Sequence, residues 1–270
     1  MRADLHVHST ASDGSLAPSA LVELAIRRGI DVLAIADHDS VEGLAEAIDA
    51  AGTALTIVPA VELSASHSGH DVHILAYFVD HTDPRLLEHL ADLRLTRLRR
   101  AETMVAALRD AGYDVSIDAV LDLSMGGAVG RSHVAAALVG AGHAESTSDA
   151  FRRLIGRGMP FYVRKDARPP GEVIATIVQA GGIAVIAHPG VTRVDTLLPG
   201  LVSAGLRGIE AFHADHSPQQ RSHYAAIARR SGLLVTGGSD YHGPGTPNPE
   251  LGSVDLPPEA VEALLAAGRR

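Results

Sequence analysis

The chain has 270 residues with a formal charge of −9, 46% hydrophobic residues, 15 histidines and no cysteine. The acidic balance argues against a large basic surface for nucleic acid, and the lack of cysteine excludes disulfides and thiolate metal ligands. No apolar stretch approaches the ~20 residues that span a bilayer, and the N-terminus lacks the apolar region of a signal peptide. We therefore expect a cytoplasmic protein that does not enter a membrane.

Short apolar runs alternate with helical patterns along most of the chain. The runs occupy residues 3–8, 31–38, 55–63, 71–78, 183–189, 208–213 and 233–242. Most are apolar at successive positions, as in strands covered on both faces. Amphipathic helices between them, such as 18–29 and 41–52, end in glycine, and another begins at Ser217 with the capping-box sequence SPQQ. This repetition predicts a parallel α/β protein.

Residues 81–174 depart from this rhythm and are mainly helical. Their longest pattern, RLLEHLADLRLTRLRRAETMVAALRDAGY, carries a run of arginines between residues 94 and 109. We interpret this run as a solvated helix face. The pattern predicts a helical insertion over 81–174 in an α/β domain formed by residues 1–80 and 175–270.

Ionisable side chains lie at or near the ends of the apolar runs. His6 and His8 share one face of the first strand, because residues two apart point the same way, and Asp13 follows in a turn rich in Ser and Gly. The later residues are His38, Glu62, His73, His188, His213, His216, Asp240 and His242. Since the carboxyl ends of parallel strands converge, we expect these side chains around one cavity.

A shared set of cations explains why so many ionisable groups follow apolar strands. A single histidine in a strand is usually a core residue, but burying this many unpaired groups would cost several kcal/mol or more. Imidazole and carboxylate ligands without thiolate suit Zn, Mn or Fe. Ions held close together polarise a phosphoryl oxygen and ionise a bound water near neutral pH, so the pattern favours hydrolysis of phosphate esters.

Six segments resemble the successive motifs of the PHP (polymerase and histidinol phosphatase) domain family: DLHVHSTASDGS, AIADHDSVEG, VPAVELSA, DVHILAY, VIAHPG and GGSDYHG. The resemblance implies a distorted (β/α)7 barrel with two or three divalent metal ions at the C-terminal strand ends. Manganese is the expected metal, with zinc or iron as alternatives. The ligands that the resemblance implies are His6, His8, Asp13, His38, Glu62, His73, His188, Asp240 and His242.

The length and the insertion resemble the stand-alone phosphoesterases of this family, in which the insertion caps the barrel and supplies phosphate-binding groups. These enzymes remove the 3′-phosphate of nucleoside 3′,5′-bisphosphates or trim RNA. We expect hydrolysis of phosphate monoesters of small nucleotides by a metal-bridged hydroxide. The alternatives are a 5′-3′ exonuclease on short RNA or DNA, a histidinol phosphatase or amidohydrolase-type C–N hydrolase, and a non-catalytic metal-binding module of a polymerase or repair assembly.

Several residues are candidates for roles around the reacting phosphate. The catalytic candidates are Asp13, His38, Asp240 and His216, with Asp13 or Asp240 also orienting the water. The substrate-binding candidates are Arg131, His133, Lys165 and His213, with Arg164 as a further cation.

Arg131 and His133 begin a predicted helix, where backbone N–H groups and a guanidinium hold an anion. For His213 and His216, phosphate binding, proton donation to the leaving group and orientation of ligands stay open. His67 and His70 are expected to be exposed in a Ser/Gly loop. The expected partner is a small phosphorylated nucleotide or short oligonucleotide, with no obligate protein partner.

Overall fold

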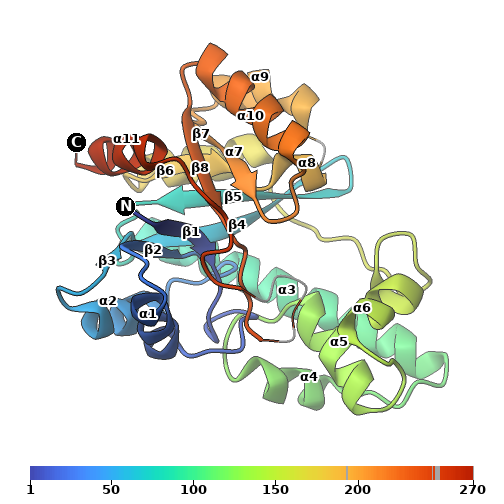
Figure 1. Ribbon diagram of the computed structural model, residues 1–270. Helices are drawn as coiled ribbons and strands as arrows, with labels where there is room; N and C mark the ends of the chain where they lie inside the picture. The colour runs from blue at the N-terminus through green and yellow to red at the C-terminus, as the bar shows by residue number, and fades with distance from the viewer. Residues whose placement is uncertain (193, 245, 247–249, 270) are drawn as a thin grey trace.

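The computed structural model describes residues 1–192, 194–244, 246 and 250–269. In this part of the chain the strands form two sheets (Figure 1). The first sheet has the strand order β1 (Ala3–Val7), β2 (Val32–Ile35) and β3 (Thr56–Ile57). The second has the order β4 (Ala60–His67), β5 (His70–Tyr77), β6 (Ile183–Ile186), β7 (Gly208–His213) and β8 (Leu234–Gly238). Helices alternate with most of these strands, so the predicted α/β class is confirmed.

Helices cover the outer faces of the sheets, and an apolar core lies between the sheets. On the first sheet pack α1 (Pro18–Arg27) and α2 (Leu44–Ala51). The later helices are α7 (Pro170–Gln179), α8 (Pro189–Thr192), the 3-10 helix η2 (Asp195–Leu197), α9 (Leu198–Ser203), α10 (Pro218–Arg230) and α11 (Pro258–Gly268). The core between the sheets contains the buried side chains of Leu5, Leu75 and Tyr77. Because the strands are covered on both faces, they are apolar at successive positions.

The prediction of a parallel protein is wrong for one strand. The other pairs are parallel, but β5 runs antiparallel to both β4 and β6. The cause is the two-residue turn Ser68–Gly69 between β4 and β5, in which both residues have positive φ, as in a tight β-hairpin. His67 and His70, expected in a loop, are the residues that pair on either side of this turn.

The third apolar run forms two strands rather than one. Pro59 separates β3 from β4, because proline lacks the N–H that a strand ladder needs. Glu62 is therefore the third residue of β4 and does not end a strand. The two sheets are joined by the isolated bridges His38–Glu62 and Val7–Tyr241. These bridges bring the polar residues of both sheets together.

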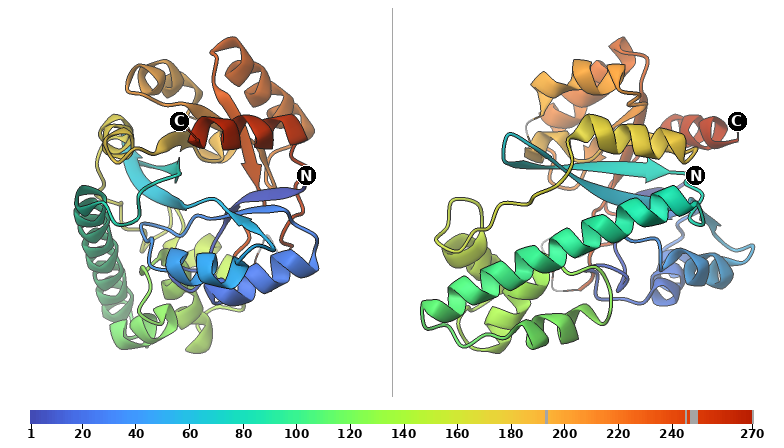
Figure 2. Two further views of the ribbon diagram at one scale, coloured as in Figure 1. Left: turned by 90° about the vertical axis from the view of Figure 1, so that its left-hand side faces the viewer. Right: turned by 180° about the vertical axis from the view of Figure 1, so that it is seen from behind.

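Residues 84–155 form a helical segment beside the sheets (Figure 1). Its helices are α3 (Pro84–Asp110), α4 (Ile117–Ser124), α5 (Arg131–Gly140), α6 (Thr147–Ala150) and the π-helix η1 (Phe151–Ile155). Figure 2 shows the long helix α3 running from the sheets along this segment. The first part of α3 packs on the second sheet through Leu86 and Leu90, and its last turns pack through Met104 and Leu108 in a separate core of the helical segment.

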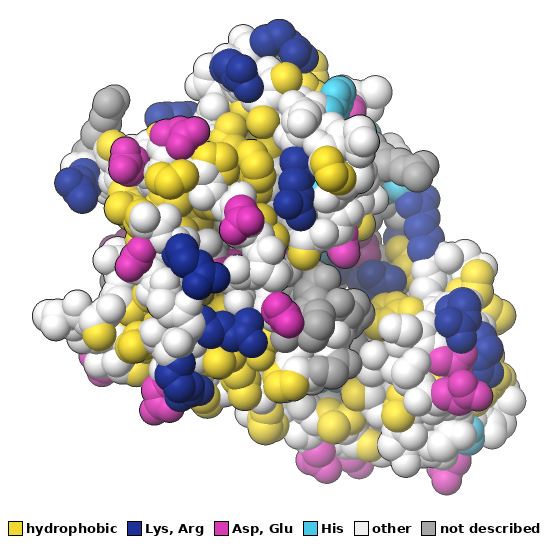
Figure 3. All heavy atoms as spheres, in the orientation of Figure 1, with side chains coloured by type: hydrophobic (Ala, Val, Ile, Leu, Met, Phe, Trp, Pro, Cys, Tyr) yellow, Lys and Arg dark blue, Asp and Glu magenta, His cyan; other side chains and the backbone are white. Residues whose placement is uncertain are grey.

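The surface agrees with two expectations from composition. On the face in Figure 3, the described Lys and Arg side chains are interspersed with Asp and Glu, and they form no extended basic patch there. Within the described residues, no helix combines the length and the apolar character needed to cross a membrane. A cytoplasmic location stays a prediction.

Candidate metal centre

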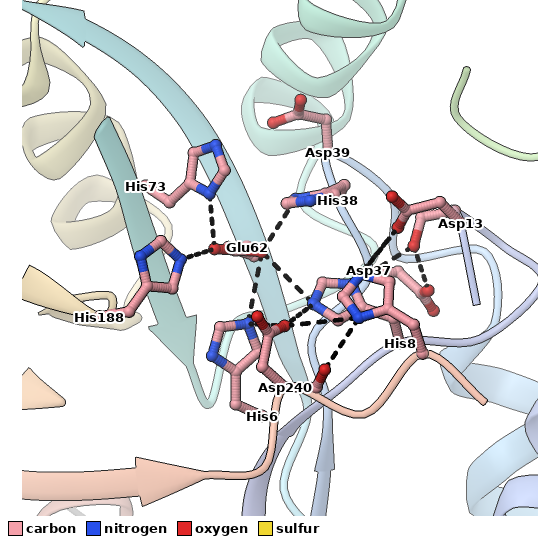
Figure 4. Close-up of polar contacts among 12 residues, drawn as sticks. His6, His8, Asp13, Asp37, His38, Asp39, Glu62, His73, His188 and Asp240 are labelled. Carbon is pink, nitrogen blue, oxygen red and sulfur yellow. Dashed lines mark hydrogen bonds and ion pairs between the residues drawn. The ribbon is translucent and has the colours of Figure 1, made fainter. Parts of the chain in front are cut away.

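The nine residues predicted as metal ligands lie together where the two sheets meet (Figure 4). Among the described residues, groups of possible ligand atoms lie within 4.8 Å of one another. The groups are His8–Asp13–His38–His242, His6–His213–Asp240, His6–His8–Glu62 and His38–Glu62–His73. His188 joins them through Nε2, which lies 3.1 Å from Glu62 Oε1. Residues from both ends of the chain thus form one cluster.

Glu62 lies at the centre of this cluster (Figure 4). Its Oε1 lies 2.8 Å from His73 Nδ1, and its Oε2 lies 2.8 Å from His38 Nδ1. The same Oε2 lies 3.3 Å from His6 Nε2 and 3.4 Å from His8 Nε2. A buried carboxylate that faces imidazoles with both oxygens is placed to bridge two cations.

Many polar atoms of the cluster are buried without hydrogen-bond partners. Among the described residues these include His6 Nε2, His8 Nε2, Asp13 Oδ1, His38 Nδ1, Glu62 Oε2, His73 Nδ1, His188 Nδ1 and His213 Nε2. Leaving such atoms unpaired costs free energy. Imidazole nitrogens and carboxylate oxygens are usual ligands of divalent transition metals, which would satisfy most of these atoms together. The donor set therefore fits a centre of more than one ion.

Glu210 holds two residues of the cluster in place, and it is not among the residues predicted from the sequence. Its Oε1 accepts a hydrogen bond from His6 Nδ1 at 2.9 Å, and its Oε2 accepts one from the backbone N–H of His188 at 2.7 Å. Because the proton of His6 is on Nδ1, its Nε2 lone pair faces the cluster. Glu210 is fully buried in β7. A charged residue inside the apolar run GIEAFH was the signal that could have identified it.

Two further buried carboxylates hold the loops that carry ligands. Asp37 accepts hydrogen bonds from the N–H of Ser9 at 2.7 Å and from Ser12 Oγ at 2.6 Å, which shapes the loop after β1. Asp4 accepts hydrogen bonds from the N–H and the hydroxyl of Ser239, at 2.9 and 2.5 Å, directly after β8. Neither carboxylate belongs to the cluster, so their role is to fix the backbone on which the ligands stand.

The cluster attracts positive charge. Burial alone would raise the pKa of Glu62, but nearby histidines, His38 first, hold that pKa well below 4.5. Burial alone would lower the pKa of His242, but Asp13 and Asp240 raise it to about 10. Ionised carboxylates in a buried site bind cations in preference to remaining unpaired, and metal binding displaces the protons.

A basic cavity of about 160 Å³ borders the cluster. Its cationic side chains are Arg97, Arg100, Arg131 and Lys165. Arg131 is the first residue of α5, as predicted. Lys165 is buried and donates a hydrogen bond to Ser64 Oγ at 2.8 Å. Burial, together with the charge of Arg97, lowers the pKa of Lys165 to about 7. Two predicted phosphate-binding residues therefore share a cavity that includes ligands of the cluster.

The interpretation of the arginine run as a solvated helix face is wrong for Arg97 and Arg100, although Arg99 and Arg109 are exposed. The side chains of Arg97 and Arg100 are each 7% exposed. Arg97 binds Asp39 and donates to Ser64 Oγ at 3.0 Å. Both arginines lie on the buried face of α3, in register with apolar residues before and after them. That register was the available signal, since a cation in an apolar helical stripe needs a buried partner.

A second cavity, of about 380 Å³, also borders the cluster. It shares Asp13, Ser132 and Phe151 with the basic cavity, and Ser132 Oγ donates a hydrogen bond to Asp13 Oδ2 at 2.8 Å. The predicted substrate-binding residue His133 lines it, with Nδ1 accepting the N–H of Gly130 at 3.0 Å. The cluster therefore lies between the small basic cavity and a larger cavity that is lined by both polar and apolar side chains.

Comparison with known protein families identifies the family of this chain. Residues 4–145 match the sequence model of the PHP domain. The chain belongs to the PHP domain family. The family predicted from the motifs is therefore confirmed.

Relatives of this PHP chain align over nearly its whole length. The 5′-3′ exoribonuclease Rnm of Escherichia coli is 36% identical over 97% of this chain and 92% of its own. The 3′,5′-nucleoside bisphosphate phosphatase of Chromobacterium violaceum is 36% identical over 94% of this chain and 92% of its own.

Solved structures show the same fold. A protein from Bifidobacterium adolescentis described as a metal-dependent phosphoesterase superposes with a TM-score of 0.91 at 36% identity, covering 98% of this chain and 96% of that one. An amidohydrolase from Chromobacterium violaceum, with bound sulfate and no metal, superposes with a TM-score of 0.89 at 35% identity, covering 99% and 97%.

His213 of this PHP chain is oriented differently from the predicted ligands. Its Nδ1 accepts the backbone N–H of Asp215 at 3.1 Å. Neutral His213 therefore carries its proton on Nε2, which lies 3.5 Å from Asp240 Oδ2. An N–H that points into the cluster donates a hydrogen bond and does not coordinate a cation. This geometry suits the predicted contact with a substrate oxygen.

His216 uses both ring nitrogens in contacts with the backbone. Its Nδ1 donates to the carbonyl of Ala211 at 2.9 Å, and its Nε2 accepts the N–H of Gly190 at 3.0 Å. This arrangement leaves it no proton to donate to a leaving group. The capping box predicted at Ser217 is confirmed, since Ser217 and Gln220 exchange hydrogen bonds at 3.2 and 2.9 Å.

Arg164 does not line either cavity. Its guanidinium lies against Gly69 in the β4–β5 hairpin, outside the basic cavity that Lys165 lines. Lys165 and Arg164 follow each other in the chain but face opposite ways, so only Lys165 is placed to contact a substrate phosphate.

Proposed function

We propose that this PHP protein is a metal-dependent phosphoesterase that removes phosphate from small nucleotides, such as the 3′-phosphate of a nucleoside 3′,5′-bisphosphate. The observation that carries the proposal is the junction of the nine-residue cluster with a cavity that presents Arg100, Arg131 and Lys165. A reacting phosphate beside the cluster would leave room for a second phosphate in the basic cavity. The activities named for the relatives from Escherichia coli and Chromobacterium violaceum support the same class.

We propose that the cluster holds two or three divalent ions, manganese first, with zinc or iron as alternatives. Their ligands would be His6, His8, Asp13, His38, Glu62, His73, His188, Asp240 and His242. Such ions, when bound, withdraw charge from a phosphoryl oxygen and make water a nucleophile near neutral pH. Glu62 would hold the ions together, and Glu210 fixes the imidazole of His6 and the backbone of His188.

The residues around the cluster orient the substrate. Asp13 accepts a hydrogen bond from Ser132 at the start of α5, which joins the cluster to the helical segment. His213 would donate its Nε2 proton in a hydrogen bond to a substrate oxygen, and Arg131 would bind phosphate. His216 would position the backbone around Gly190, two residues after His188.

We also propose that the two sheets are the sides of a distorted (β/α)7 barrel, with the helical insertion as its cap. The isolated bridges between the sheets support this view, because they join strands across both gaps. The predicted division assigns residues 1–80 and 175–270 to the barrel and residues 81–174 to the insertion. Helix α7, which begins at Pro170, packs on the second sheet with the barrel.

A 5′-3′ exoribonuclease is the second candidate. The larger cavity favours it, because a nucleotide chain that places its first phosphate in the basic cavity has space to continue past Asp13. The named activity of the Escherichia coli relative points the same way. Both candidates would use the same cluster: in each, water attacks phosphorus and an alcohol oxygen of the substrate leaves. They differ in whether that phosphorus is a terminal phosphate monoester or a diester within a nucleotide chain.

Substrate comparison tests the proposal. The protein loaded with Mn²⁺, Zn²⁺ or Fe²⁺ is given adenosine 3′,5′-bisphosphate, a short 5′-phosphorylated RNA, histidinol phosphate and an N-acylated amino acid. We expect fastest release from the bisphosphate, next from the RNA, and loss of turnover in Asp13→Ala with the fold retained by circular dichroism. Retained activity in that variant, or hydrolysis of the amide alone, contradicts the proposal.

A further inference from the structure

One carboxylate oxygen lies between two arginines of the basic cavity. Asp71 Oδ2 is 3.3 Å from Arg131 Nη2 and 3.5 Å from Arg100 Nη2. Asp71 comes from β5, whereas both arginines come from the helical segment. Asp71 thus makes ion pairs with two different helices through a single oxygen.

The two guanidinium groups are held in place by other contacts. Arg100 Nε donates to the carbonyl of Val163 at 2.8 Å, and its guanidinium lies 5.5 Å from the ring centre of Tyr162. The Arg131 guanidinium lies between the rings of Phe151 and Tyr162, at 5.5 and 5.6 Å. Aromatic faces orient guanidinium groups. Asp71 is therefore not needed to form this pair of arginines.

One donor of the pair lacks a hydrogen-bond acceptor, whereas Arg131 Nη2 donates to Asp71 Oδ2 at 3.3 Å. Arg100 Nη2 is buried and has no hydrogen-bond partner among the described residues, since its contact with Asp71 is a longer ion pair. Unpaired charged donors are costly when buried. The cavity beside it is open, and a phosphate presents several oxygens where Asp71 presents one. The arrangement is that of an anion site in which a protein carboxylate holds one oxygen position.

We propose that Asp71 competes with the substrate phosphate for Arg100 and Arg131 and so keeps the affinity of the basic cavity for phosphate low. The identity of the anion rests on the proposed function. Arg97 is already paired with Asp39, and Asp13, which also lines the cavity, belongs to the cluster. Asp71 is therefore the carboxylate that opposes Arg100 and Arg131. Without it, two unopposed guanidinium groups would hold a phosphate dianion tightly and release it slowly.

The proposal predicts which anions respond to the loss of Asp71. A fixed negative charge repels a dianion about twice as strongly as a monoanion at the same place. Replacing Asp71 by the isosteric Asn therefore strengthens binding of inorganic phosphate more than binding of dimethyl phosphate. A carboxylate that only positioned the arginines would have the opposite effect, with weaker binding of both anions.

The test is calorimetric titration of the metal-loaded protein with both anions at about pH 8, where phosphate is a dianion. We expect Asp71→Asn to bind inorganic phosphate about tenfold more tightly, with a smaller gain for dimethyl phosphate. The matched control is Asp92→Asn, because Asp92 also contacts an arginine, Arg168, at 3.2 Å but is exposed. It should change phosphate binding by less than about twofold. Weaker or equal binding of phosphate by Asp71→Asn overturns the proposal.

A double variant separates competition from a general change of charge. In the Arg131→Gln background, Asp71 has lost one of the two groups that it occupies, so the gain from Asp71→Asn should shrink to about twofold or less. An undiminished gain contradicts the proposal. These binding measurements do not depend on turnover. Tighter phosphate binding by Asp71→Asn without ester hydrolysis by the wild type would refute the proposed function and support this inference. Normal hydrolysis without tighter binding would support the proposed function and refute this inference.

Discussion

The metal centre and the basic cavity next to it are built in different ways. The side chains of the centre stand on strands or directly after them, and buried carboxylates such as Glu210 and Asp37 fix their rings and loops. The cations of the basic cavity come from α3, α5 and the chain after η1. Aromatic rings and a carbonyl group hold Arg100 and Arg131, whereas Arg97 binds a carboxylate and Lys165 a hydroxyl. The sheets thus carry the cluster, and the helical segment carries most cations of the basic cavity beside it.

The largest effect is expected at the residue that holds the centre together. Glu62→Gln removes the charge that faces His38, His73 and His6. We expect it to lose bound metal and at least about a thousandfold in kcat/KM. Metal content by plasma mass spectrometry and turnover check this. Full metal content with full activity would show that the cluster does not depend on its central carboxylate.

A smaller and different effect is expected in the basic cavity. Arg100→Gln should raise KM for a bisphosphate about 10–100-fold, because a buried charged donor is lost, while metal content stays unchanged. Arg99→Gln is the matched control, since Arg99 is on the same helix and exposed. If both variants behave alike, or if Arg100→Gln releases metal, the separation of recognition from the centre is wrong.

Glu210 tests how far the centre depends on support from the sheet. Glu210→Gln keeps the size of the side chain but weakens its hold on His6 Nδ1 and on the backbone of His188. We expect metal affinity to fall about 10–100-fold, with activity restored at high metal concentration. Chelator competition measures the affinity. Activity that excess metal does not restore would indicate a direct role in the reaction instead.

The smallest effect concerns α3, where the sheets and the helical segment meet. His89 is buried in this helix, and burial lowers its pKa below 6.5. The folded protein therefore keeps His89 neutral, and as pH falls through about 6.5 only the unfolded chain gains the proton, which costs stability. In urea unfolding of the metal-free protein between about pH 8 and about pH 5.5, the free energy of unfolding should fall by about 1 kcal/mol less for His89→Leu than for the wild type.

The control for this experiment is His67→Leu, at an exposed position of the β4–β5 hairpin. It should follow the wild-type pH dependence, because folding leaves this side chain in contact with solvent. Parallel curves for wild type and His89→Leu would show that the buried histidine is protonated without cost.

Local patterns predicted the parts of this protein that depend on near neighbours in the chain. Apolar runs and glycine-ended helices predicted the α/β class, SPQQ predicted the start of α10, and the ordered motifs predicted the nine residues that meet in the cluster. These features are visible in the sequence because strand ends converge in this fold, whatever the details of packing.

Tertiary structure decided what depends on distant partners. The helical period sets two arginines of α3 on its apolar face, but only the tertiary structure shows their partners, Asp39 and the carbonyl of Val163. The tautomer of His213 depends on one backbone N–H. The position of Asp71 between two arginines depends on the contact of β5 with the helical segment. Charge and hydrogen bonding act through space, so the sequence determined the ligands and the fold determined what surrounds them.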